Sequence, residues 1–95
     1  MAFHQTAGGK VRPAVVLLDA GDDDLVAAPV TSRARSSEYD LSLQDWRAAG
    51  LNVPSTVRIH KLTVLLKSEI VRHLGCLAKQ DRDSLTLALA RAFQG

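Results

Sequence analysis

Two apolar runs, GGKVRPAVVLLD (residues 8–19) and DDLVAAPVTS (residues 23–32), decide the fold class. Residues 11–18 are β-branched and aliphatic without polar alternation, which is typical of a strand buried on both sides. Residues 25–31 have a similar composition, and the DAGDDD segment between the two runs (residues 19–24) is typical of a turn. We therefore predict a β-hairpin whose loop is longer than the tightest types.

The outer ends of this hairpin carry residues that a strand interior does not need. Arg12 precedes a proline at the start of the first strand, and Thr31 and Ser32 close the second strand. In an antiparallel hairpin, the start of one strand lies beside the end of the next. We therefore expect Arg12 and Thr31 to lie at neighbouring strand ends and to form a site.

The middle of the chain predicts one short strand and one short helix. Residues 39–43 are expected to form an edge strand. A helix is expected over residues 43–49, with Ser42 as N-cap, Asp45 at the capping-box position and Gly50 at its end. Trp46 is expected to pack this helix onto the body of the domain.

The second half of the chain returns to strand patterns. Residues 55–66 alternate in part, which predicts a strand, a kink near His60 and Lys61, and a further strand. Residues 70–77 predict another strand, with Gly75 as a bulge or a point of close approach.

The chain ends in a predicted amphipathic helix. Asp81 and Asp83 lie in its first turn, where negative charge opposes the helix dipole favourably. Its expected apolar face consists of Leu85, Ala88, Leu89, Ala92 and Phe93. Together these elements predict a mainly β (α+β) fold, a small compact β-barrel with short helices and a C-terminal helix on its outside.

Composition narrows the class of protein. The 95 residues suit a single domain over residues 1–95, and a net charge of +2 with a pI near 9.0 permits a nucleic-acid partner without requiring one. Cys76 is the only cysteine, which excludes an internal disulfide and a multi-cysteine zinc site and fits a cytoplasmic location. No apolar stretch approaches the 18 or so residues of a membrane span, so we expect no membrane partner.

Several blocks, in this order, resemble the MazF/PemK toxins of bacterial type II toxin–antitoxin pairs. The resemblance runs from about Gly8 to Phe93. It implies an SH3-like barrel, a homodimer, and a metal-independent endoribonuclease without a cofactor that cuts single-stranded RNA, including mRNA, at short sequence motifs. It also implies a cognate antitoxin as partner, in a complex that binds DNA. The blocks are GGKVRPAVV, LVAAPVTS, YDLSL followed by AGL, STVRIHKL, and VRHLGCL.

The resemblance also implies site residues. The family's arginine in the Arg-Pro block falls on Arg12, and its threonine at the end of the next strand falls on Thr31. We predict that both are catalytic, because a guanidinium offers paired donors to phosphoryl oxygens and a hydroxyl both donates and accepts. No metal ligand is expected, and the predicted RNA-binding residues are Lys10, Pro13, Ser32, Arg33, Arg35, His4 and His60.

Two positions differ from the family pattern. Family members usually begin with a strand that opens on Gly-Asp, whereas this chain begins near the end of that segment, so we expect the domain to lack the family's first strand. The acidic residue often found at the later strand kink is His60 here. The general base stays open. His60 and His4, which we place in the loop leading to Arg12, are candidates because histidine as a residue type changes charge near neutral pH. Proton transfer by Arg12 itself would require a strongly altered environment.

Other interpretations stay open for the residues and for the protein. Arg12 could form an ion pair with an acid of the turn at residues 22–24. Arg33 and Arg35 could belong to a solvated loop rather than bind the RNA backbone. The protein could be a non-catalytic toxin of the same fold that binds a protein target such as a topoisomerase, or an inactive truncated remnant.

Overall fold

The strands of this protein form one curled antiparallel sheet. The computed structural model describes residues 2–6, 12–33 and 36–94, with residues 2–6 as backbone only. A 3-10 turn, η1 (Lys67–Glu69), precedes the last strand, and the chain ends in helix α1 (Lys79–Ala92). The seven strands are β1 (Ala2–Thr6), β2 (Arg12–Asp19), β3 (Asp24–Thr31), β4 (Asp40–Ser42), β5 (Thr56–Arg58), β6 (Thr63–Leu66) and β7 (Ile70–Cys76).

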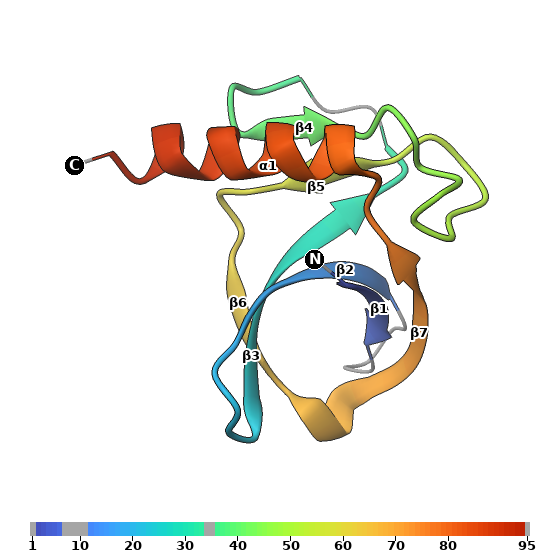
Figure 1. Cartoon of the computed structure of the whole chain (residues 1–95), viewed down its shortest axis with the longest axis vertical. Helices are drawn as coiled ribbons and strands as arrows, with labels where there is room; N and C mark the ends of the chain where they lie inside the picture. The colour runs from blue at the N-terminus through green and yellow to red at the C-terminus, as the bar shows by residue number, and fades with distance from the viewer. Residues whose placement is uncertain (1, 7–11, 34–35, 95) are drawn as a thin grey trace.

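Strand β3 is the centre of the sheet. The strand order is β4-β5-β3-β2-β1-β7, and β6 pairs with the first half of β3 while β5 pairs with its end. The sheet curls so that β6 and β7 approach each other through η1 (Figure 1). The predicted mainly β fold with a C-terminal helix is confirmed, although in the described part of the chain no pairing of β6 with β7 closes the sheet.

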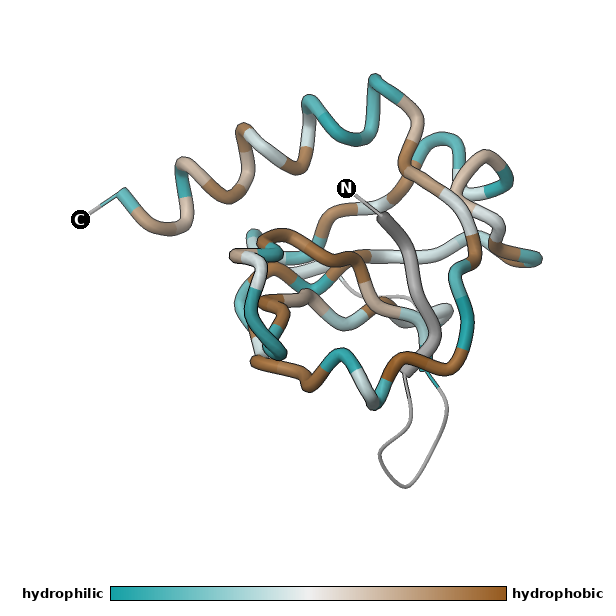
Figure 2. Tube along the Cα trace, turned by 60° about the horizontal axis from the view of Figure 1, so that its bottom comes forward, coloured by the Kyte–Doolittle hydropathy of each residue, from teal (hydrophilic) through white to brown (hydrophobic). Residues whose placement is uncertain are grey.

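Helix α1 lies across β4 and β5 at one end of the sheet (Figure 1), and its apolar and polar residues alternate along the coil (Figure 2). Leu85 is fully buried in the core, and Ala88, Leu89 and Ala92 pack against it, as predicted. Phe93 is the exception to the predicted apolar face. It is the C-cap residue, one position beyond the helix, and it is 62% exposed.

The predicted hairpin is formed by β2 and β3. Its pairs run from Ala14 opposite Pro29 to Asp19 opposite Leu25, with a register shift between Val16 and Leu18. Val15, Ala28 and Val30 are buried in the core. The prediction that the first strand is buried on both sides is wrong for its second half, because Leu18 is 56% exposed.

Strand β1 was not predicted, and it corrects the placement of His4 in a loop. His4 lies within β1, which pairs with β2 on one side and β7 on the other. The AFHQT sequence has little strand signal of its own, so its extended backbone is imposed by hydrogen bonding to both neighbours.

The helix predicted over residues 43–49 is wrong: the segment forms turns. The first backbone donors of the segment bond outside it: Leu43 N donates to Ser55 O at 3.0 Å and Gln44 N donates to Asp81 Oδ1 at 2.8 Å. These bonds replace the helical ladder. Gly50, predicted to end this helix, instead ends the turn, at a φ of 87°. Trp46 packs against the core, as predicted.

The kink and the close approach in the second half of the chain are confirmed. β5 ends at Arg58, residues 59 and 60 form a turn, and β6 follows. At Gly75 in β7, a Cβ atom would lie 2.9 Å from Ala49 O, so the two backbones meet where a larger residue would not fit. None of the described residues forms a helix long and apolar enough to cross a membrane.

Candidate active site

Arg12 and Thr31 meet at one end of the β2–β3 hairpin. Ala14 lies opposite Pro29, and each step back along β2 moves one step forward along β3, so Arg12 falls opposite Thr31. Both residues line a cavity of about 370 Å³ and an adjoining cavity of about 340 Å³. The predicted juxtaposition of the two strand ends is therefore present in the structure.

Among the described residues, the charged ones that line these cavities are all cations. The larger cavity is bordered by Arg12, Arg33, Arg58 and Lys61, together with Pro29, Val30 and Thr31. The adjoining cavity is lined by Arg12, Pro13, Val30, Thr31, Ser32, Arg33, Leu51, Val53 and Ser55. A wall whose described charged groups are guanidinium and ammonium ions favours an anionic ligand, and paired arginine donors match phosphate.

Thr31 is fixed by its position in the sheet. It is half-buried, it pairs with the buried Thr56 of β5, and its Oγ1 accepts a hydrogen bond from Arg33 N at 3.1 Å. Because this bond uses the oxygen as acceptor, the hydroxyl proton can still be donated to a ligand. The same bond holds the start of the segment that carries Arg33.

Arg58 is a site residue that the sequence analysis missed. Its Nε donates to Asp40 Oδ1 at 3.1 Å, and its Nη2 lies 3.3 Å from His60 Nε2. The side chain of Asp40 is only 2% exposed, while that of Arg58 is 24% exposed. In sequence, Arg58 is merely the polar member of an alternating strand; only the pairing of β4 with β5 places it opposite Asp40.

Asp40 remains ionised in spite of its burial. Burial favours the neutral acid, but hydrogen bonds from Ser37 and the contact with Arg58 outweigh it and hold the pKa of Asp40 below its ordinary value of 3.8. Its Oδ2 accepts from Ser37 N at 3.1 Å, so both carboxylate oxygens are engaged.

The remaining predicted RNA-binding residues divide into three groups. Pro13, Ser32 and Arg33 lie on the cavity walls with Arg12 and Thr31. His60 is exposed beside Arg58, with its ring centroid 5.6 Å from that of Tyr39, and is not among the residues lining either cavity. His4 is described only as part of the β1 backbone, and Lys10 and Arg35 lie outside the described residues.

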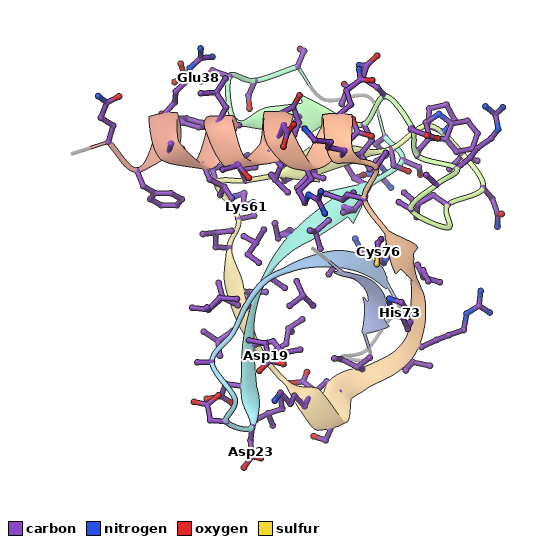
Figure 3. The ribbon with its side chains drawn as sticks, in the orientation of Figure 1. Asp19, Asp23, Glu38, Lys61, His73 and Cys76 are labelled. Atoms are coloured by element: carbon purple, nitrogen blue, oxygen red, sulfur yellow. The ribbon has the colours of Figure 1, made fainter. Side chains whose placement is uncertain are left out.

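The acidic turn at residues 22–24 is too distant to pair with Arg12. It lies at the other end of the hairpin, and the eight residues of β2 span roughly 25 Å at about 3.3 Å each. Figure 3 shows Asp19 and Asp23 at the opposite end of the sheet from Lys61, which borders the cavity. Asp19 instead bonds to Lys67 Nζ at 3.0 Å, and bonds from Gly21 N and Lys67 lower its pKa.

The sequence as a whole matches one protein family. Residues 1–93 match the family model described as "PemK-like, MazF-like toxin of type II toxin-antitoxin system". This chain belongs to that family. The resemblance predicted from the sequence blocks is thereby confirmed, and the cationic cavities are a feature of a PemK-like, MazF-like toxin.

Solved structures of similar fold agree with this assignment. The Mycobacterium tuberculosis toxin MazF-mt6 superposes with a TM-score of 0.85 at 22% identity, covering 99% of this chain and 97% of that one. An endoribonuclease in complex with its cognate antitoxin from a mycobacterial species has a TM-score of 0.80 at 18% identity, covering 98% and 91%. The MazE–MazF complex of Deinococcus radiodurans has a TM-score of 0.74 at 23% identity, covering 96% and 88%. A search of curated protein sequences gave no match.

Proposed function

We propose that this protein is a metal-independent endoribonuclease that cleaves single-stranded RNA at short sequence motifs, as the toxin of a type II pair. One observation carries the proposal: Arg12 and Thr31 border a cavity whose charged lining residues are all cationic. Membership of the PemK-like, MazF-like family supports it, and so do two structural neighbours whose names describe endoribonucleases.

The arrangement suits cleavage by the RNA's own 2′-hydroxyl. The 2′-oxygen attacks phosphorus and the P–O5′ bond breaks, which leaves a 2′,3′-cyclic phosphate and a 5′-hydroxyl. The 2′-hydroxyl loses its proton, the leaving oxygen gains one, and negative charge grows on the phosphoryl oxygens. Arg12 and Arg58 supply charged donors for these oxygens, and the Thr31 hydroxyl donates a hydrogen bond to one of them.

The partners follow from the same surface. Single-stranded RNA presents phosphates to the cationic walls and base edges to the surrounding loops. We further propose a homodimer and a cognate antitoxin that competes with RNA for this surface. Two structural neighbours were solved with an antitoxin, which supports the second of these proposals.

The decisive experiment measures RNA cleavage without metal. Purified protein is incubated with a long mixed-sequence RNA in excess EDTA, and the cut ends are mapped by primer extension. We expect cuts at one short motif, and a loss of about a hundredfold or more in rate for Arg12→Ala, because one removed charge-stabilising donor typically costs that much. Arg82→Ala is the matched control, because it also replaces an exposed arginine by alanine, but on α1 and away from the cavity.

Two results would contradict this proposal. A folded wild-type protein that leaves every RNA intact would exclude the nuclease and favour a toxin that binds a protein target. Cleavage that survives Arg12→Ala but stops in His60→Ala would retain the nuclease and refute the assigned role of Arg12.

A further inference from the structure

The buried carboxylate of Asp40 contacts Arg58, which lines the larger cavity. Asp40 lies in β4 directly opposite Arg58 of β5, and its side chain is 2% exposed. It is not among the residues lining the larger cavity, whereas Arg58 is. The described residues of the cavity wall therefore present positive charge, while the carboxylate that pairs with Arg58 is not part of that wall.

Each oxygen of Asp40 holds a different part of the site. Oδ1 accepts from Arg58 Nε at 3.1 Å, and Oδ2 accepts from Ser37 N at 3.1 Å. The backbone of Asp40 also donates to Ser37 O at 3.1 Å. Ser37 lies in the turn that leads into β4, so this one carboxylate holds both Arg58 and that turn.

We propose that Asp40 is a positioning residue of the active site: it fixes the guanidinium of Arg58 so that the remaining N–H donors face the phosphate in the cavity. This role rests on the proposed ribonuclease function. It concerns Arg58, which acts on the phosphate itself, and not a contact of Asp40 with RNA.

Two considerations support a residue that fixes Arg58: the repulsion among the cations of the cavity, and the orientation of the guanidinium donors. Four cations border one cavity of about 370 Å³ and repel one another, so an unheld arginine turns toward water. A guanidinium has five N–H donors, and the bonds to Asp40 and His60 engage only its Nε and Nη2 nitrogens. A donor fixed in advance stabilises a transition state better than one that must reorganise during the reaction.

The test is a double-mutant cycle with Asp40→Asn and Arg58→Gln, made singly and together. Asparagine and glutamine keep the approximate size and the polarity of the two side chains. Only the double variant leaves neither charge unpaired, because Arg58→Gln alone leaves the buried Asp40 carboxylate without its cation, so the free energy of unfolding of each variant is measured as well. Asp83→Asn is the matched control, because Asp83 forms an exposed ion pair with Lys79 on α1. For each variant, kcat and KM for a defined RNA are measured in EDTA, and hydrogen exchange of Arg58 Nε–H is followed by NMR.

We expect Asp40→Asn to lower kcat by roughly tenfold to a hundredfold with little change in KM, since misplacement of a catalytic group costs about that much. The double variant should cleave at the rate of Arg58→Gln alone. Exchange of Arg58 Nε–H should accelerate in Asp40→Asn, and Asp83→Asn should behave as wild type.

Other outcomes refute the proposal. Reduced stability with unchanged kcat in Asp40→Asn would make Asp40 a purely structural residue, and additive effects in the cycle would show that it acts without Arg58. If the wild-type protein cleaves no RNA, the ribonuclease function fails. The exchange measurement still decides the positioning, because unaltered exchange of Arg58 Nε–H in Asp40→Asn overturns it.

Discussion

At the scale of single residues, the surroundings of Arg58 and Arg12 determine their chemistry. Arg12 was predicted to be a site residue because it stands at the start of a strand beside a proline, and the structure places it opposite Thr31. Arg58 has no such sequence signal, and its relevance arises from contacts with Asp40 and His60. The sequence position of Arg12 therefore predicted it as a site residue, whereas Arg58 was found only from its contacts in the structure.

The lowered pKa of Asp40 predicts a pH dependence of stability. A carboxyl whose pKa is lower in the folded state stabilises the fold above its unfolded pKa, near 3.8, and loses that contribution as the pH falls through the lower folded value. The free energy of unfolding of the wild type should therefore approach that of Asp40→Asn below pH 3.8. Urea unfolding from pH 7 to pH 2 measures the gap, and a gap that does not narrow would contradict the prediction.

Two glycines with positive φ provide a matched pair of substitutions. Gly21 has a φ of 90° with no atom within 4 Å of an added Cβ, whereas at Gly50, with a φ of 87°, that Cβ would overlap Leu74 O. Gly21→Ala should cost about 1–2 kcal/mol through backbone strain alone. Gly50→Ala should cost about 3 kcal/mol or more, because overpacking is added to the strain. If chemical denaturation shows the same loss in free energy of unfolding for both variants, the contact with Leu74 adds no cost at Gly50.

At the scale of elements, the segment from Leu43 to Gly50 shows how a tertiary contact overrides a local signal. Ser42 and Asp45 have the spacing of a helix start, but the backbone donors of Gln44 and Asp45 bond to Asp81 of α1, each at 2.8 Å. Asp45 Oδ1 instead accepts from Ala48 N within the turn. A partner 36 residues away in sequence thus determines the conformation, and no local pattern reports it.

Asp81 is therefore expected to matter far more for stability than its neighbour Asp83. Asp81 is 1% exposed, and in Asp81→Asn one carboxylate oxygen becomes an NH₂ group that faces a backbone donor. An unsatisfied buried donor costs about 1–3 kcal/mol, so the free energy of unfolding should fall by about that amount. Asp83→Asn serves as control, since its partner Lys79 is exposed, and equal stability of both variants in urea would refute the role of Asp81.

At the scale of the whole molecule, the distribution of charge matters more than its sum. The net charge is only +2, yet four cations from the ends of different strands and their loops border one cavity. Folding concentrates them because the sheet places the end of β3 between the start of β2 and the short strand β5. The prediction that the domain lacks the family's first strand stays a prediction, while β1 lies between β2 and β7 in the sheet.

This concentration of charge predicts a strong dependence of RNA binding on salt. Each phosphate contact with a single strand contributes a slope of about −0.7 to the plot of log affinity against log salt concentration. Lys61→Ala should therefore make the slope shallower by about 0.7 for a non-cleavable 2′-deoxy oligonucleotide, measured by fluorescence anisotropy. Arg82→Ala, which removes a cation from α1, should leave the slope unchanged, and equal slopes for both variants would exclude Lys61 from the phosphate path.

Four features were predictable from local sequence: the β2–β3 hairpin, the kink after β5, the C-terminal helix, and the placement of Arg12 beside Thr31. These features follow from local periodicity and from the geometry of adjacent antiparallel strands, so neighbouring residues suffice to predict them. Only the tertiary structure decided the turn at residues 43–50, the strand at β1, and the Asp40–Arg58 pair. In each case the determining hydrogen bond or ion pair joins residues distant in sequence, and its energy exceeds a local preference of a few tenths of a kcal/mol per residue.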